Sequence, residues 1–289
     1  MSQIKRRQFL KNYLAAGFLT LLPVPAAASP RFRFEGELRR NDWRKPEEKF
    51  GFSLGLASYT FRAFSLEQTI AMTLRLGLEK LVLKDFHLPL GASPAEIKKV
   101  SEKVRLAGLD LYGCGVVYME KPEEVERAFS YARTAGMRII IASPDPGLLP
   151  LLEQKVRETG ISLAIHNHGP GDRFYPTPAV AYDRIKNLDR RLGLCLDIGH
   201  AVRAGVDPAE AARKFSDRLL DIHLKDVSAA SREGQTVEAG RGVIDLKSFL
   251  KTIIELKYRR TLAFEFEKDE KDPLPGVAES VGFIRGLLS

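Results

Sequence analysis

The chain is poor in residues that would cross-link it, and its apolar stretches are short. Only two of its 289 residues are cysteine, Cys114 and Cys195, and both lie within apolar runs. A disulfide framework is therefore excluded, and we expect two buried, unpaired thiols. The apolar run of residues 13–24 is too short for a membrane helix, and Pro23 and Pro25 interrupt it.

The N-terminus instead has the order of a secretory signal. Basic residues at 5–11 precede the apolar run, and the small residues at 26–29 are of the kind that a signal peptidase cleaves. Arg6 and Arg7 resemble the pair of a twin-arginine export signal, although Lys5 stands where Ser or Thr is usual. We expect residues 1–28 to be removed, leaving an exported, periplasmic protein that is free of the membrane. An uncleaved basic anchor is the alternative.

Charge gives little support for a nucleic-acid partner. Four basic side chains are the only charged groups in residues 1–28, so removing this segment lowers the formal net charge from +8 to +4. An excess this small does not suit binding to a phosphate backbone. Residues 29–51 are also basic and lack apolar periodicity. We interpret them as a lead-in segment before the folded domain.

From residue 52 onward, short apolar runs alternate with longer amphipathic ones. Eight runs have the length and composition of strands buried on both faces: residues 53–59, 80–84, 110–117, 138–142, 162–165, 192–197, 219–224 and 261–266. Helical patterns separate them, including residues 66–76, 95–107, 123–135, 148–159, 208–215 and 246–256. Eight β-α units in one stretch predict an α/β fold, a single (β/α)8 TIM barrel over residues 52–289. A doubly wound open sheet is the alternative.

All five histidines fall at or just after the end of a predicted strand. They are His87, His166, His168, His200 and His223. In a TIM barrel the carboxyl ends of the strands meet at one rim, where active sites are built. The histidines are therefore expected to gather at that rim.

Two carboxylates, Asp197 and Glu265, fall at the ends of the sixth and eighth predicted strands. A carboxylate buried there is costly unless a cation or several donors compensate it. Together with His166 and His223, these two carboxylates could surround one divalent ion, Mn, Zn, Co or Mg. The alternative is that Asp197 caps the next helix and the histidines bond to backbone carbonyls.

Four segments then resemble the sugar isomerase/epimerase superfamily of xylose isomerase-like TIM barrels. They are residues 163–168, 196–200, 221–226 and 264–265. The resemblance implies a metal-dependent enzyme that acts on a small carbohydrate, removing a proton next to a sugar carbonyl with a metal-stabilised enolate. It implies Asp197, His223 and Glu265 as metal ligands and places His200 against the substrate.

The first ligand departs from the family pattern. His166 stands where Glu is expected, so only Glu265 remains of the two carboxylates that move protons in such epimerases. Elimination instead needs a base, an electrophile and an acid for the leaving group. Lys84 and His87 after the second strand, with His200, could supply them. A lyase or dehydratase on 3-keto-glycosides or keto-sugars is therefore the alternative to an isomerase or epimerase.

Further residues are expected to bind the substrate. His168 and Lys225 lie two residues beyond predicted ligands, and Arg241 lies in a glycine-rich loop at 234–245. Phe174 or Tyr175 could stack on a sugar ring. The competing interpretations are ion pairs of Lys84 and Lys225 with the next aspartate, and a plain connecting loop around Arg241.

Two other functions were weighed on the same residues. Abasic-site endonucleases of this superfamily resemble a three-zinc design that needs a further histidine directly after the third strand and another after the seventh-strand histidine. Here no histidine lies directly after the third predicted strand, and none lies anywhere after His223. A non-catalytic sugar-binding barrel would need no acid or base. The presence of His87, Lys84, His200 and Glu265 together favours an enzyme.

Overall fold

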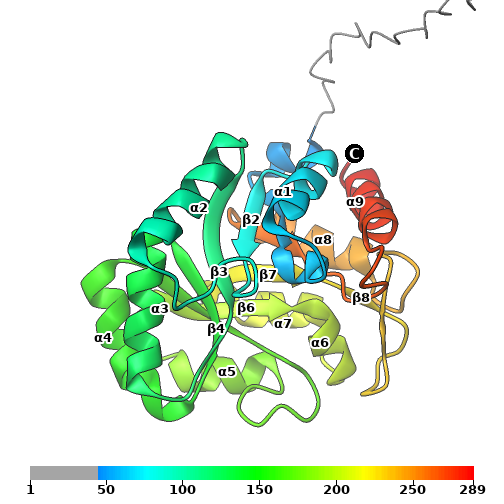
Figure 1. Cartoon of the computed structure of the whole chain (residues 1–289). Helices are drawn as coiled ribbons and strands as arrows, with labels where there is room; N and C mark the ends of the chain where they lie inside the picture. Colours follow the sequence, from blue (N-terminus) through cyan, green and yellow to red (C-terminus); the bar gives the residue numbers. More distant parts are fainter. Residues whose placement is uncertain (1–44) are drawn as a thin grey trace, which may run out of the picture. The chain divides into compact units, whose positions relative to one another are not determined.

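Eight parallel strands close into a barrel in the computed structural model, which describes residues 45–289 (Figure 1). Each strand pairs with its neighbours in sequence, and the last closes on the first. The strands are β1 Ser53–Ala57, β2 Lys80–Leu83, β3 Asp110–Met119, β4 Ile139–Pro144, β5 Ser162–His166, β6 Leu192–Asp197, β7 Leu219–Leu224 and β10 Thr261–Phe264. The predicted single (β/α)8 barrel is confirmed, and the open sheet is excluded.

Helices cover the outside of the barrel. They are α1 Leu66–Arg75, α2 Pro94–Leu106, α3 Pro122–Ala135, α4 Leu149–Thr159, α5 Pro178–Ile185, α6 Ile198–Arg203, α7 Pro208–Lys214, α8 Leu246–Glu255 and α9 Leu274–Leu288. The six helices expected from periodicity are present. Helices α5, α6 and α9, of eight, six and fifteen residues, were not among the six. Within residues 45–289, no helix has both the length and the apolar character to cross a bilayer.

Short elements complete the chain. Four 3-10 helices are present in the described part: η1 Pro46–Phe50, η2 Ser58–Phe61, η3 Pro146–Leu148 and η4 Ser216–Arg218. The glycine-rich loop after β7 begins as an antiparallel hairpin of β8 Asp226–Val227 and β9 Thr236–Val237. Three predicted strands end earlier than expected: the chain turns into η2 at Ser58, β2 stops at Leu83, and β10 stops at Phe264.

The barrel core explains why the sequence folds this way. Strand residues are buried almost throughout, as expected for a parallel sheet that packs on both faces. Gly136 and Gly160 end α3 and α4 with φ of 66° and 71°, a left-handed conformation that glycine adopts without strain. Cys114 and Cys195 are buried free thiols, as predicted.

The expected signal at residues 1–28 lies outside the described residues, as does the lead-in as far as residue 44. Its export route therefore stays a prediction. The last part of the lead-in is described and contains η1. Glu47 of η1 is buried and accepts a hydrogen bond from Arg285 of α9 at 3.1 Å. This contact joins the start of the described chain to its last helix.

A buried arginine fastens the entry to β6, the strand that ends in Asp197. The Arg218 guanidinium donates to the carbonyls of Asp189 and Leu192 at 2.9 and 3.0 Å. It also donates to the carbonyls of Lys186 and Leu188 at 2.7 and 2.8 Å. One side chain therefore satisfies four carbonyl groups around the loop between α5 and β6.

Replacing this arginine should destabilise the barrel. We expect Arg218→Met to lower the free energy of unfolding by about 3 kcal/mol, because buried carbonyls lose their donors. Urea unfolding followed by circular dichroism measures the change. Arg127→Met on the exposed side of α3 is the matched control, with an expected change below about 0.5 kcal/mol. Equal unfolding midpoints for the two variants would contradict this role.

Candidate metal centre

Four side chains from four strands meet at the carboxyl end of the barrel. His166 and Asp197 are the last residues of β5 and β6, His223 lies near the end of β7, and Glu265 follows β10 directly. All four are buried, and each offers a ligand atom within 4.8 Å of the other three. Strand register contributes, because Asp197 pairs with His223 across β6 and β7. The structure thus brings together the four predicted metal ligands.

The spacing of their ligand atoms suits one small ion. His166 Nε2 lies 3.2 Å from His223 Nδ1 and 3.5 Å from Asp197 Oδ2. Glu265 Oε2 lies 3.3 Å from His223 Nδ1 and 3.9 Å from His166 Nε2. Ligands of a tetrahedral zinc ion are separated by about 3.3 Å when each bond is about 2.0 Å. The four atoms therefore nearly have the separations that a bound cation requires.

Buried atoms without partners also point to a cation. Asp197 is fully buried, and its Oδ2 accepts no hydrogen bond from the described residues. A carboxylate oxygen in that position is costly without donors, and the ammonium near it, Lys225 Nζ at 3.2 Å, is shared with two other carboxylates. This residue set, two imidazoles and two carboxylates, fits a divalent ion in both chemistry and geometry.

Lys225 supplies one positive charge at the centre. Its Nζ lies 3.0 Å from Glu265 Oε2, 3.2 Å from Asp197 Oδ2 and 2.8 Å from Glu267 Oε1. Burial alone would lower its pKa, but these three carboxylates raise the pKa of Lys225 well above its ordinary value. Three carboxylates and one ammonium leave a charge of −2 when the imidazoles are neutral. A divalent cation would neutralise it.

Asp197 has two roles that its two oxygens divide. Oδ1 accepts the backbone N–H of His200 at 2.7 Å and caps α6. Oδ2 faces the cluster. Asn167 then holds the Asp197 backbone through two hydrogen bonds, at 2.9 and 3.0 Å. Capping and cation binding are therefore compatible, and Asn167 is a positioning residue that the sequence analysis missed.

His200 is held as a neutral ring beside Lys225. Burial above all lowers the pKa of His200 to about 3. Its Nδ1 lies 3.1 Å from Arg203 Nη1, and its Nε2 lies 3.4 Å from Lys225 Nζ. Arginine and the lysine ammonium can only donate, so each ring nitrogen of His200 faces a donor.

His168 is a second neutral imidazole, closer to the opening. Burial chiefly lowers the pKa of His168 to about 3. Its Nδ1 lies 3.5 Å from Asp172 Oδ2, and its Nε2 lies 3.2 Å from the Tyr118 hydroxyl. The carboxylate favours the proton on Nδ1, which leaves a lone pair on Nε2. Its ring lies 4.5 Å from that of His166, so this lone pair is next to the cluster.

The sequence analysis missed Tyr118. This residue lies just beyond the predicted end of the third strand, at residue 117, and no polar motif surrounds it. It is 59% exposed and stacks on His168 with a ring separation of 5.6 Å. Conversely, Tyr175 is 0% exposed and cannot stack on a sugar, which corrects that expectation. Phe174 is only partly buried.

His87 lies outside the four-residue cluster and is enclosed by its own partners. Its Nδ1 lies 2.9 Å from Ser58 Oγ, and its Nε2 lies 3.0 Å from Thr69 Oγ1 and 3.1 Å from the Phe64 carbonyl. Burial lowers the pKa of His87. Both ring nitrogens have hydrogen-bond partners and neither is free to contact a substrate. The catalytic role of His87 therefore stays a prediction.

Lys84 and Arg241 also have other partners. Lys84 Nζ donates to the Val116 carbonyl at 2.6 Å and pairs with Asp85 at 3.3 Å, as the competing interpretation expected. Arg241 forms two hydrogen bonds with Glu279 of α9, at 2.5 and 2.7 Å. Neither contacts the cluster, so their assigned roles stay predictions.

A small cavity of about 160 Å³ lies against the cluster. Lys225, Arg203, Gln235, Glu267 and Lys268 are among its lining residues. Lys225 thus contacts both the two predicted carboxylate ligands and this cavity. None of the four predicted ligands is among its lining residues, so Lys225 is the link between the cavity and the cluster.

Family comparisons agree with this architecture. Residues 147–287, slightly less than half of the chain, match the family described as xylose isomerase-like TIM barrel. The inosose dehydratase of Lacticaseibacillus casei is 28% identical over an alignment of 138 residues. The alignment covers 42% of this chain and 45% of that protein. The chain therefore spans about half the length of the curated relatives it matches.

Solved structures share the whole barrel. An L-ribulose 3-epimerase superposes with a TM-score of 0.68 at 17% identity, covering 82% of this chain and 94% of that one. The IolI protein, solved with a bound zinc atom, gives 0.67 at 14% identity, covering 82% and 98%. These likenesses show that the fold is a xylose isomerase-like TIM barrel.

Two neighbouring histidines test the assignment of the centre. We expect wild-type protein to hold one divalent ion per chain, and His166→Asn to weaken its binding at least about 100-fold, because a direct ligand is lost. His168→Asn is the matched control and should change metal affinity less than about threefold. Elemental analysis after dialysis and calorimetric titration measure both. Equal losses in the two variants would contradict the assignment.

Proposed function

We propose that this chain is a metal-dependent carbohydrate enzyme of the xylose isomerase-like family, and that it acts as a lyase on a cyclic keto-sugar or keto-glycoside. The observation that carries the proposal is the buried cluster of His166, Asp197, His223 and Glu265 with Lys225 against it. The matched curated relatives are dehydratases, which supports elimination.

The carboxylates present favour elimination over epimerisation. Exchange of a proton on opposite faces of a sugar calls for two free acid–base groups of matched strength. Here Glu265 belongs to the cluster, His166 stands 3.9 Å from it in place of a second carboxylate, and Glu267 is paired with Lys225. An isomerase or epimerase would share only the first proton transfer with this lyase.

His168 is the group best suited to take the proton next to the carbonyl. It is neutral at pH 7, and Asp172 favours the tautomer with a free lone pair on Nε2. Tyr118 donates to that lone pair in the structure, and a bound substrate would take its place. Asp172, 3.5 Å from Nδ1, would also stabilise the positive charge that His168 gains when it takes the proton.

Lys225 is the acid for the leaving group. His168 first removes the C–H proton and leaves an enolate, whose return to the starting ketone would exchange that proton with solvent. The neighbouring C–O bond then breaks, and the departing oxygen takes a proton from the Lys225 ammonium. His200, whose Nε2 lies 3.4 Å from Lys225 Nζ, would contact the substrate next to Lys225. A divalent cation in the cluster would supply Lewis acidity toward the carbonyl oxygen.

Exposed aromatic rings beside the centre support a ring-shaped substrate. Tyr118 at the end of β3 and Phe86 after β2 are 59% and 44% exposed. Phe86 also contacts Tyr59 with a ring separation of 6.1 Å. Aromatic faces exposed next to a polar site offer apolar area to the C–H face of a sugar.

Product analysis in deuterated water tests the reaction. We expect metal-loaded protein to convert an inosose or a 3-keto-glycoside with loss of water or aglycone, read by NMR. Deuterium incorporation with an inverted centre or a shifted carbonyl would indicate an epimerase or isomerase instead. Binding without any conversion would indicate a sugar-binding barrel and overturn the proposal.

Two variants separate the proton transfers. His168→Asn should lose both deuterium exchange and elimination by about 100-fold or more, because the base is gone. Lys225→Met should keep exchange but lose elimination by a similar factor. Lys268→Met, which changes another lysine of the same cavity, is the matched control and should stay within about threefold. Loss of exchange in Lys225→Met with its metal retained would contradict the division of roles.

The aromatic contact has its own test. We expect Tyr118→Ala to raise KM about tenfold, since stacking area is lost, whereas Tyr118→Phe keeps the ring and should raise KM less than about threefold. Steady-state kinetics measure both variants, with the substrate that the product analysis identifies. A KM unchanged by Tyr118→Ala would show that the substrate does not contact this ring.

A further inference from the structure

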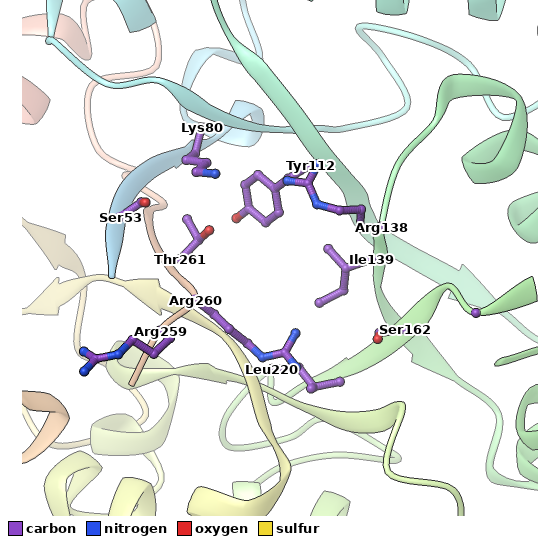
Figure 2. A pocket seen from close by; sticks show the side chains of 11 residues that line it. Ser53, Lys80, Tyr112, Arg138, Ile139, Ser162, Leu220, Arg259, Arg260 and Thr261 are labelled. Atoms are coloured by element: carbon purple, nitrogen blue, oxygen red, sulfur yellow. The ribbon is translucent and has the colours of Figure 1, made fainter. Parts of the chain in front are cut away.

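A second cavity lies at the opposite end of the barrel from the metal centre. It has a volume of about 450 Å³. Ser53, Lys80, Ser162 and Thr261, which line it, are the first residues of their strands, whereas His166 and Asp197 end theirs. In a parallel barrel these are the two opposite openings. Figure 2 shows the lining side chains arranged around the empty space.

The barrel interior separates the two ends. A cluster of buried side chains fills the middle of the strands, with Val82, Ile141, Ala164 and Cys195 among its members. Such a layer is a packed core rather than a pore. A molecule in the second cavity therefore cannot be the substrate at the metal centre.

The lining of this cavity is strongly basic. Lys80, Arg138, Arg259 and Arg260 line it, and no carboxylate does. The arginine ion pairs in residues 45–289 do not include Arg259 or Arg260. Arg259 instead donates to the Phe50 carbonyl. Within residues 45–289, neither of these two guanidinium groups therefore has a carboxylate at ion-pair distance.

Two nearby carboxylates offset only part of this charge. Asp110 accepts from both Lys80 and Arg138 at 2.7 Å, through a single oxygen. Asp221 lies in the barrel interior and interacts with Tyr112 and Arg260. Four cations against two carboxylates leave an excess of two positive charges, which matches the charge of a phosphate monoester near neutral pH.

The floor of the cavity offers one buried hydroxyl. Tyr112 is 5% exposed, and its hydroxyl interacts with the Asp221 carboxylate, which is fully buried. Figure 2 shows this hydroxyl pointing into the space enclosed by the lining residues, on the side of Thr261. A hydroxyl that donates to a carboxylate keeps its lone pairs, so Tyr112 can accept a hydrogen bond from a ligand hydroxyl placed there.

We propose that this cavity binds a small phosphate monoester. The phosphoryl group would lie on Arg260 and Arg259, because guanidinium groups match phosphate oxygens in paired hydrogen bonds. The volume exceeds that of phosphate alone and leaves room for a small polar body, such as a sugar, next to Tyr112 and Thr261. This site does not depend on the proposed function of the metal centre.

Calorimetric titration tests the site without any turnover. Glucose 6-phosphate should bind saturably, inorganic phosphate more weakly and glucose not at all. The affinity should be the same with and without a divalent metal, because the two ends are separate. Tighter binding of citrate than of glucose 6-phosphate would overturn the phosphate assignment. Binding that requires the metal would place the ligand at the other end and overturn the site.

Variants then assign the contacts. Arg260→Gln should weaken glucose 6-phosphate binding by about tenfold, and Tyr112→Phe by about threefold, because a charged and a neutral hydrogen bond are lost. Arg127→Gln on exposed α3 removes the same charge elsewhere and should change affinity less than about twofold. Circular dichroism checks that each variant is folded. Wild-type affinity in Arg260→Gln, or no saturable binding by wild type, would overturn the proposal.

Discussion

The concentration of negative charge at the carboxyl end of the barrel is the constraint on which the rest of the site depends. Asp197 and Glu265 are buried, Glu267 is partly exposed, and all three pair with Lys225, which balances only one of their three charges. Such a group is stable only with a further cation or with protonated imidazoles beside it. Burial opposes protonation of His223, but Cys195 and Glu265 raise its pKa well above the ordinary value. The negative charge that a metal ion would neutralise thus already favours the protonated form of His223.

Orientation of the reactive groups follows from neighbours rather than from the cluster itself. Asn167 holds the Asp197 backbone, so that residue caps α6 with one oxygen and faces the cluster with the other. Arg203 lies 3.1 Å from Nδ1 of His200, and Asp172 lies 3.5 Å from Nδ1 of His168. Two neutral imidazoles are therefore present near the cluster, each with a charged side chain at its Nδ1.

The two ends of the barrel have opposite electrostatic character. Carboxylates gather at the carboxyl ends of the strands, and arginine and lysine gather where the strands begin. A layer of buried side chains fills the barrel between the two ends and separates them. This separation allows one end to attract a metal cation while the other attracts an anion. Neither site needs to exchange ligands with the other.

The sequence by itself determined the barrel, the ends of its strands and the four candidate ligands. These are local features, since a strand buried on both faces is apolar throughout and any polar residue at its end is conspicuous. Only the tertiary structure decided which partner each polar side chain has. Lys225 turns away from Asp226 to carboxylates up to 42 residues distant, and Arg241 pairs with Glu279 of α9. His87 is enclosed by groups from η2 and α1. Such contacts depend on how separate elements pack, which the order of residues along one strand does not specify.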